Sequence, residues 1–206
     1  MESKNRNYGL SIVRLLAMIM IIICHVLQSQ DYALRYYFNA GVYVFLFLSG
    51  FLYGQKEISD IAGFFKKQFL KLYIPYILVL IVIVSVNIIT GNATSVKEIA
   101  SSVLCLQWYG TSVPRCGHLW YVSCIIFCYA LIPLLQYFAK SFTVVSVKNK
   151  WFIIATIVVI LQLMNSFGAM PQTASEISCF VIAYLVAYWK LNESGFLNRG
   201  GYCYHY

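Results

Sequence analysis

Long runs of apolar residues, separated by short polar segments, dominate the pattern of this 206-residue chain. Most of these runs reach the roughly 17 to 25 residues that an α-helix needs to cross the hydrocarbon core of a bilayer. The last two runs are shorter, but neither carries a charge in its middle. We therefore predict an all-α fold, a polytopic transmembrane helix bundle with about six spans. The predicted spans are Tyr8–Gln28, Leu34–Tyr53, Leu72–Thr90, Leu119–Phe138, Trp151–Phe167 and Ala174–Leu191.

Lysine and arginine residues are distributed unevenly over the segments between these spans. Eleven lie in the two terminal segments and in the second and fourth connections, whereas the alternate connections hold only Arg35, Lys97 and Arg115. Connections rich in Lys and Arg stay in the cytoplasm. We therefore predict that both termini are cytoplasmic. The segments predicted to face outside are Ser29–Asp31, Gly91–Gly117 and Gly168–Thr173.

Composition agrees with a membrane protein and argues against other classes. Hydrophobic residues make up 61% of the chain and charged residues 11%, whereas a soluble domain is about half apolar and a quarter charged. The net charge of +8 is spread over short connections, so we expect no nucleic-acid partner. No Cys/His spacing matches a zinc site, and we expect no metal. The lipid bilayer is the partner that composition predicts.

The longest outer segment, Gly91–Gly117, has features of its own. Apolar residues recur at helical spacing over Ser95–Trp108, which predicts a short helix lying on the outer surface. Cys105 and Cys116, two of the seven cysteines, share this segment. They could pair if the segment faces an oxidising compartment.

The first span contains two groups that are costly inside a membrane, Arg14 and His25. A helix turns about 100° and rises about 1.5 Å per residue, so these two residues share one face, about 16 Å apart along the axis. An intramembrane arginine usually faces protein or a water-filled cavity. A guanidinium binds phosphate or carboxylate, and an imidazole suits general-base work near neutral pH. His118, which opens the fourth span, is predicted at a depth similar to that of His25.

Structural explanations compete with this interpretation. A single histidine near a helix end is more often structural than catalytic, and Arg14 is near enough to the cytoplasmic end to extend toward lipid headgroups. Any two residues eleven apart share a helix face. Ser49 is a poor candidate nucleophile, because no Gly-x-Ser-x-Gly turn or adjacent base accompanies it. The small residues Gly50 and Gly54 beside it indicate close helix packing.

A basic and aromatic segment, Phe64–Tyr76 (FFKKQFLKLYIPY), lies on the cytoplasmic side of the third predicted span. Lys67 and Lys71 are one helical turn apart, and Lys66 adjoins them. These lysines could bind the phosphates of a large anionic cofactor. An ordinary basic flank that contacts anionic lipid explains the same residues, and both interpretations stay open. Pro75 predicts a helix start or a kink.

Four of these segments, in this order, resemble the acyltransferase-3 family of integral membrane acyltransferases. They cover roughly Tyr8 to Leu135, and the remainder matches only as apolar helices. The matching segments are the Arg14-x10-His25 pair, the Gly41–Leu52 stretch GVYVFLFLSGFL, Phe64–Tyr76, and HLWYVSCIIFCYALIP with His118, Trp120, Tyr129 and Pro133.

The resemblance implies transfer of an acyl group, usually acetyl, from cytoplasmic acetyl-CoA to a hydroxyl of an extracytoplasmic glycan. Typical acceptors are capsule, O-antigen, exopolysaccharide or peptidoglycan sugars, in a bacterial plasma membrane. By motif, Arg14 and His25 are the pair associated with activity, Arg14 on the donor side and His25 at acyl transfer, as general base or transient acyl carrier. His118 and Trp120 are expected to line the same cavity. The lysines expected near the place where CoA enters are Lys66, Lys67 and Lys71.

The chain departs from the family in its length. Family members have several more spans, and the tail NRGGYCYHY does not resemble their later helices. We therefore expect a single domain, residues 1–206, that is incomplete relative to the family. An inactive fragment is one alternative. A transporter or flippase for a lipid-linked sugar is another, although the sequence shows no internal repeat of the kind that marks transporters. The acceptor sugar, the acyl group and the oligomeric state are left open.

Overall fold

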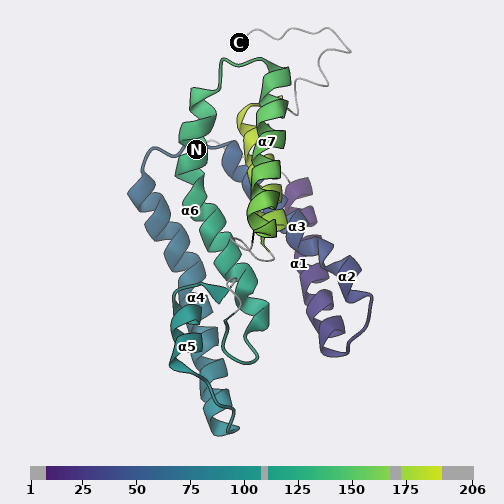
Figure 1. The fold of residues 1–206 in the computed structure, drawn as a ribbon, viewed down its shortest axis with the longest axis vertical. Coiled ribbons are helices and arrows are strands. Elements are labelled where there is room, and N and C mark those ends of the chain that lie inside the picture. The colour runs from purple at the N-terminus through teal and green to yellow at the C-terminus, as the bar shows by residue number, and fades with distance from the viewer. Residues whose placement is uncertain (1–7, 108–110, 168–172, 192–206) are drawn as a thin grey trace.

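The computed structural model describes residues 8–107, 111–167 and 173–191, and within these ranges every regular element is helical. This confirms the all-α prediction. Lys4, Arg6, Trp108, most of Gly168–Thr173 and the tail from Asn198 lie outside the described residues. The elements in Figure 1 are α1 (Tyr8–Ser29), α2 (Arg35–Phe38), α3 (Ala40–Gly54), α4 (Ile61–Ile89), α5 (Val96–Val103), the 3-10 turn η2 (Gly117–Leu119), α6 (Trp120–Ser141), α7 (Val147–Ser166) and α8 (Ala174–Tyr188).

Five of the predicted spans form helices that are long and apolar enough to cross a membrane. They are α1, the α2–α3 segment, α4, the η2–α6 segment and α7. The sixth predicted span forms α8, which has 15 residues and therefore extends only about 22 Å. Helix α8 packs against α3, α6 and α7, and its side chains Phe180, Tyr184 and Leu185 are fully buried. It is the central helix of the bundle.

Glycines permit the close contact between α3 and α8. A Cβ atom at Gly50 would overlap the carbonyl oxygen of Phe180, and one at Gly54 would overlap that of Tyr184. On the neighbouring α1–α3 contact, a Cβ at Gly41 would lie 2.8 Å from the carbonyl oxygen of Ala17. The predicted close packing of this small-residue stretch is therefore confirmed.

Helix α4 begins earlier than the hydropathy pattern predicts. The Asp60 side chain accepts a hydrogen bond from the Gly63 amide at 2.9 Å and caps a helix that starts at Ile61, eleven residues before the predicted start at Leu72. Pro75 was predicted to mark a helix start or a kink; because it lies inside this helix, the helix start is wrong and the kink stays a prediction. Hydropathy detects the apolar part of the helix, whereas the cap and the helix-forming lysines extend it into the polar flank. The basic segment is consequently helical.

The predicted outer helix is present but shorter than expected, because α5 ends at Val103. Ser95 and Glu98 form a capping box at its start. Two tyrosines of α4 hold it: Tyr73 Oη donates to the carbonyl of Val103 at 2.9 Å, and Tyr76 Oη donates to that of Ser102. Figure 1 shows α5 lying along α4.

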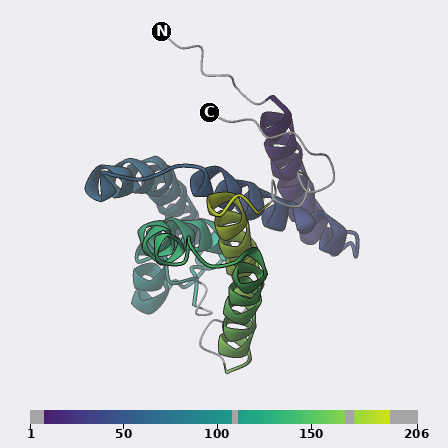
Figure 2. The ribbon, with the colours of Figure 1, turned by 90° about the horizontal axis from the view of Figure 1, so that it is seen from above.

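The helices run alternately up and down, which gives the bundle two ends. At one end, called the basic end here, the α3–α4 and α6–α7 connections meet. The backbone of Ile58 exchanges two hydrogen bonds with the Gln136 side chain there, and Trp189 Nε1 donates to the carbonyl of Ala139 at 2.9 Å. The opposite end carries the α1–α2 turn, α5 and η2 (Figure 1). Viewed from above, α1 and α4 lie on opposite sides of the molecule, with α3, α6 and α8 between them (Figure 2).

Candidate active site

Arg14 faces the interior of the bundle. Its guanidinium lies over the Phe45 ring of α3, 5.7 Å from the ring centroid. Phe45 in turn contacts the ring of Tyr121, which belongs to α6. The side chain is half-buried. This geometry disfavours the alternative in which Arg14 extends along lipid to the headgroups.

No carboxylate among the described residues forms an ion pair with Arg14. The ion pairs found there join Arg35 to Asp31 and Lys140 to Glu57. A guanidinium in a low-dielectric interior is stabilised by an anion or by polar neighbours. Here the contact is with an aromatic ring, so the positive charge can still attract an anionic ligand.

His25 and His118 meet at the opposite end of the bundle. Their ring centroids are 5.8 Å apart, and the rings are inclined by 69° in an edge-on contact. His25 is half-buried on α1, and His118 is exposed on η2. The structure thus brings together two imidazoles that are far apart in the sequence. They lie at a similar depth, as the sequence predicts.

The two predicted parts of the site lie along the same pair of helices. Helix α1 is continuous from Tyr8 to Ser29, so Arg14 and His25 share a face about 16 Å apart along its axis. On the other side, His118 of η2 meets His25, while Tyr121 of α6 contacts Phe45, the ring under Arg14. A strip of polar and ionisable groups therefore runs along α1, η2 and α6 from one end of the bundle toward the other.

Trp120 lies next to this strip but packs toward the core. Its ring contacts that of Tyr121 edge-on, with centroids 6.3 Å apart, and it adjoins the buried cluster around α8. The Trp120 ring is therefore partly buried against Tyr121 and the core, and its expected place in a cavity shared with His118 stays a prediction.

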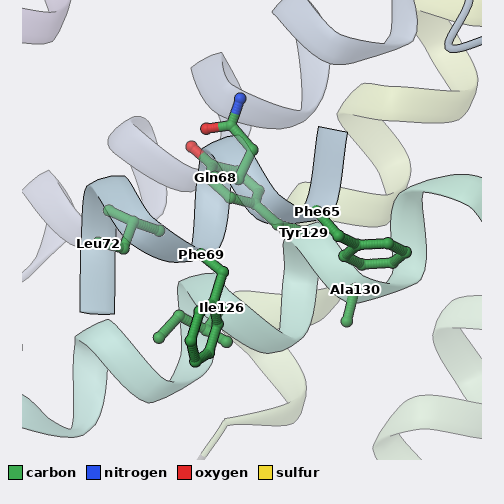
Figure 3. Close-up of a pocket in the computed structure, with 7 residues that line it drawn as sticks. All are labelled: Phe65, Gln68, Phe69, Leu72, Ile126, Tyr129 and Ala130. Atoms are coloured by element: carbon green, nitrogen blue, oxygen red, sulfur yellow. The ribbon is translucent and has the colours of Figure 1, made fainter. Parts of the chain in front are cut away.

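The predicted lysines Lys66, Lys67 and Lys71 are exposed on the N-terminal half of α4. A cavity of about 120 Å³ lies next to them, between α4 and α6 (Figure 3). The lysines do not line it, and its polar side chains are Gln68 and Tyr129. The lining residues are Phe65, Gln68, Phe69, Leu72, Ile126, Tyr129 and Ala130.

Sequence reasoning missed a group of hydroxyls beside Arg14. Phe45, Ser49 and Tyr53 are spaced four residues apart, so they share one face of α3. Tyr121 contacts Phe45 edge-on with ring centroids 5.9 Å apart, and Tyr129 contacts Tyr53 at 5.0 Å. The four-residue spacing on α3 was visible in the sequence, but the partners on α6 depend on how the helices pack.

Cys105 and Cys116 lie between α5 and η2, and both thiols are free in the structure. Cys116 is fully buried and Cys105 is half-buried. Burial raises the pKa of both thiols above the ordinary cysteine value. They are therefore protonated and weakly reactive at neutral pH.

Comparison with known proteins gives one family. A family model described as an acyltransferase domain matches residues 7–203. This match extends well beyond Leu135, where the motifs that carry the sequence resemblance end. Neither the curated proteins nor the solved structures give a match.

Proposed function

The chain belongs to the acyltransferase-3 family, whose model matches residues 7–203 of its 206 residues, and we propose that it is a membrane O-acyltransferase of surface glycans. In this proposal an acetyl group passes from cytoplasmic acetyl-CoA to a hydroxyl of an extracytoplasmic glycan, across a bacterial plasma membrane. The acyl donor enters from the basic end and the glycan from the opposite end.

One observation carries the proposal: α1 presents Arg14 to the protein interior and His25 to a second imidazole, about 16 Å further along the same face. A fixed cation suits the anionic part of the donor. An imidazole suits proton transfer at the reacting hydroxyl. The separation places these two tasks at different depths of the bundle, as transfer across a membrane requires.

In the proposed reaction, the unprotonated nitrogen of His25 takes the proton of the acceptor hydroxyl. The hydroxyl oxygen then forms a bond to the thioester carbonyl carbon, the carbon–sulfur bond breaks, and the leaving thiolate takes the proton from the imidazolium. In the alternative in which His25 is a transient acyl carrier, its nitrogen first bonds to the acyl carbon while the carbon–sulfur bond breaks and the thiolate leaves. The acceptor hydroxyl oxygen then takes the acyl group from the nitrogen, and the hydroxyl proton passes by way of the imidazole to the thiolate. His118 and Trp120 would line the acceptor side, His118 next to His25 and Trp120 against Tyr121.

The lysines Lys66, Lys67 and Lys71 would attract the donor before it binds. Their exposure beside the α4–α6 cavity supports this part of the proposal. An anion concentrated by surface lysines binds faster, and the effect falls with ionic strength.

Substitution of the two principal residues tests the proposal. We expect Arg14→Ala and His25→Ala to abolish acetylation of the surface glycan in the expressing bacterium, and to stop release of CoA thiol from acetyl-CoA by purified protein. Arg35→Ala is the matched control for Arg14, because Arg35 pairs with Asp31 at the exposed end of the molecule.

Membrane-fraction immunoblots must show equal amounts of each variant, so that lost activity reflects chemistry rather than insertion. Unchanged glycan acetylation in both alanine variants would reject the proposal. Binding of acetyl-CoA without any thiol release would indicate an inactive relative of such an enzyme. A transporter of lipid-linked sugar would bind no acetyl-CoA at all.

A further inference from the structure

Four hydroxyl-bearing residues line the contact between α3 and α6 that also holds Phe45, the ring under Arg14, and they are called the hydroxyl cluster here. Tyr121 contacts the Phe45 ring edge-on with centroids 5.9 Å apart, and Tyr129 contacts the Tyr53 ring with centroids 5.0 Å apart. Helix α1 supplies the guanidinium, so three helices meet at this point. The members of the cluster are Ser49, Tyr53, Tyr121 and Tyr129.

Two hydroxyls of the cluster are buried without a hydrogen-bond partner among the described residues. These are Ser49 Oγ and Tyr121 Oη, and the Ser49 residue is only 1% exposed. The Ser49 hydroxyl lies beside that of Tyr129 without forming a hydrogen bond of normal geometry. Buried polar groups are nearly always hydrogen-bonded. Two buried hydroxyls without a partner among the described residues, in the helix contact that also holds the Arg14 guanidinium, suggest a ligand site.

The polar groups of Arg14 and the hydroxyl cluster can all donate hydrogen bonds. Guanidinium is a pure donor, and each hydroxyl has a hydrogen to donate. The buried carboxylate of Glu176 on α8 does not form an ion pair with Arg14, and the ion pairs among the described residues join other side chains. A cation and two O–H donors match a group with a negative charge and several acceptor oxygens, which is the description of a phosphate.

The hydroxyl cluster adjoins the α4–α6 cavity through Tyr129. Tyr129 lines that cavity and also contacts the Tyr53 ring of the cluster. The cavity is otherwise mainly apolar, so it can hold an uncharged part of a ligand whose phosphate lies at Arg14. The reacting carbonyl belongs about 16 Å further along α1, near His25, which argues against the thioester itself lying at the cluster.

We propose that Arg14 and the hydroxyls of Ser49 and Tyr121 together bind a phosphate group of the acyl donor. This inference rests on the proposed function, because it assigns a binding site to the same donor. The inference adds Ser49 and Tyr121, which neither their residue types nor the family resemblance predicts as binding residues. It gives Ser49 a role in binding, whereas the sequence disfavours Ser49 as a nucleophile.

Binding measurements on protein purified in a neutral detergent test the inference, since no anionic lipid competes there. The probe is CoA, measured by isothermal titration calorimetry. We expect Tyr121→Phe and Ser49→Ala each to weaken CoA binding about tenfold, as the loss of a hydrogen bond to a charged group does. Tyr137→Phe is the matched control, because Tyr137 is on the same helix and 75% exposed.

Thermal unfolding separates binding from stability. Tyr121 Oη has no hydrogen-bond partner to lose in the described part of the chain, so we expect Tyr121→Phe to unfold at the temperature of the unsubstituted protein. Unchanged CoA affinity in both variants would overturn the inference. Pantetheine lacks the phosphates, and an equal loss of pantetheine affinity would overturn the phosphate assignment. Failure of the unsubstituted protein to bind CoA would instead contradict the proposed function.

Discussion

Arg14 shows why residue type alone does not define a membrane site. A guanidinium in the first span is expensive whichever way it points. The structure decides the direction, because the group lies over the Phe45 ring of the neighbouring helix. The ring stabilises the cation without neutralising it, and no ion pair among the described residues includes Arg14, which supports the proposed ligand site.

The planar shape of Arg14 matters as well as its charge. We expect Arg14→Lys to keep the charge but to weaken CoA binding about tenfold, because an ammonium cannot present two parallel donors to a phosphate. The measurement is CoA affinity by calorimetry, with Arg35→Lys as the matched arginine control. CoA affinity equal to that of the unsubstituted protein would show that charge alone suffices.

The thiols of Cys105 and Cys116 give a pH prediction. Burial raises the pKa of both groups, so the reactive thiolate is scarce below that pKa and increases as pH rises toward it. We expect alkylation by iodoacetamide to be slow at pH 7 and to accelerate about tenfold per pH unit. Peptide mass spectrometry gives the extent of modification at each cysteine.

The denatured protein supplies the control for this measurement, because its thiols regain ordinary pKa values and exposure. Rapid modification of folded protein at pH 7, equal to that of the denatured form, would contradict the buried placement of Cys116.

The individual residues of the site were predictable to different degrees. Arg14 and His25 could be placed on one face from helix geometry alone. Their contacts with Phe45 and His118 could not, because these depend on the crossing of α1 with α3 and on the position of η2. The role of the free hydroxyls at Ser49 and Tyr121 required coordinates, since sequence does not show which polar atoms lack partners.

At the scale of elements, the α3–α8 contact sets the position of the site. Helix α3 carries Phe45, Ser49 and Tyr53 on the side of α1 and α6, and its glycines let α8 approach from behind. Moving α3 away from α8 would therefore displace the hydroxyls that α3 contributes to the hydroxyl cluster.

Substitution in this contact should destabilise the bundle. We expect Gly50→Ala to lower the free energy of unfolding by about 1 to 3 kcal/mol, because the new methyl group overlaps the carbonyl oxygen of Phe180. Unfolding in mixed micelles of increasing denaturing detergent measures the change. Gly117→Ala is the control, since a Cβ there has no neighbour within 4 Å. Equal stability of both variants would contradict the tight α3–α8 packing.

The boundaries of elements were less predictable than their existence. Hydropathy located α4 but missed its first eleven residues, because the helix is extended by the Asp60 cap and by polar helix formers. Because of this extension, Lys66, Lys67 and Lys71 lie on a helix beside the cavity.

Helix α8 was predicted as a span because it is apolar. A short helix that is buried by protein on all sides is equally apolar, so hydropathy does not distinguish the two.

At the scale of the whole molecule, the order of up and down helices places Arg14 nearer the basic end and the two imidazoles at the opposite end. The sequence predicted this order, because alternation of spans and the distribution of Lys and Arg do not depend on packing details. The lysine and arginine bias predicts which end faces the cytoplasm, and this bias acts on membrane insertion rather than on the folded helices.

This orientation is testable and decides whether the proposed chemistry is possible. We expect alkaline phosphatase, a reporter that is active only outside the cytoplasm, to be active when fused after Thr90 and inactive when fused after Lys148. Fusion after Glu57 is the control for the α3–α4 connection, and it should be inactive as well. The opposite activities would place Arg14 toward the outside, where no acyl-CoA is available. Arg14 would then face the glycan and the two imidazoles would face the acyl-CoA. The proposed function therefore depends on the orientation of the bundle as well as on these residues.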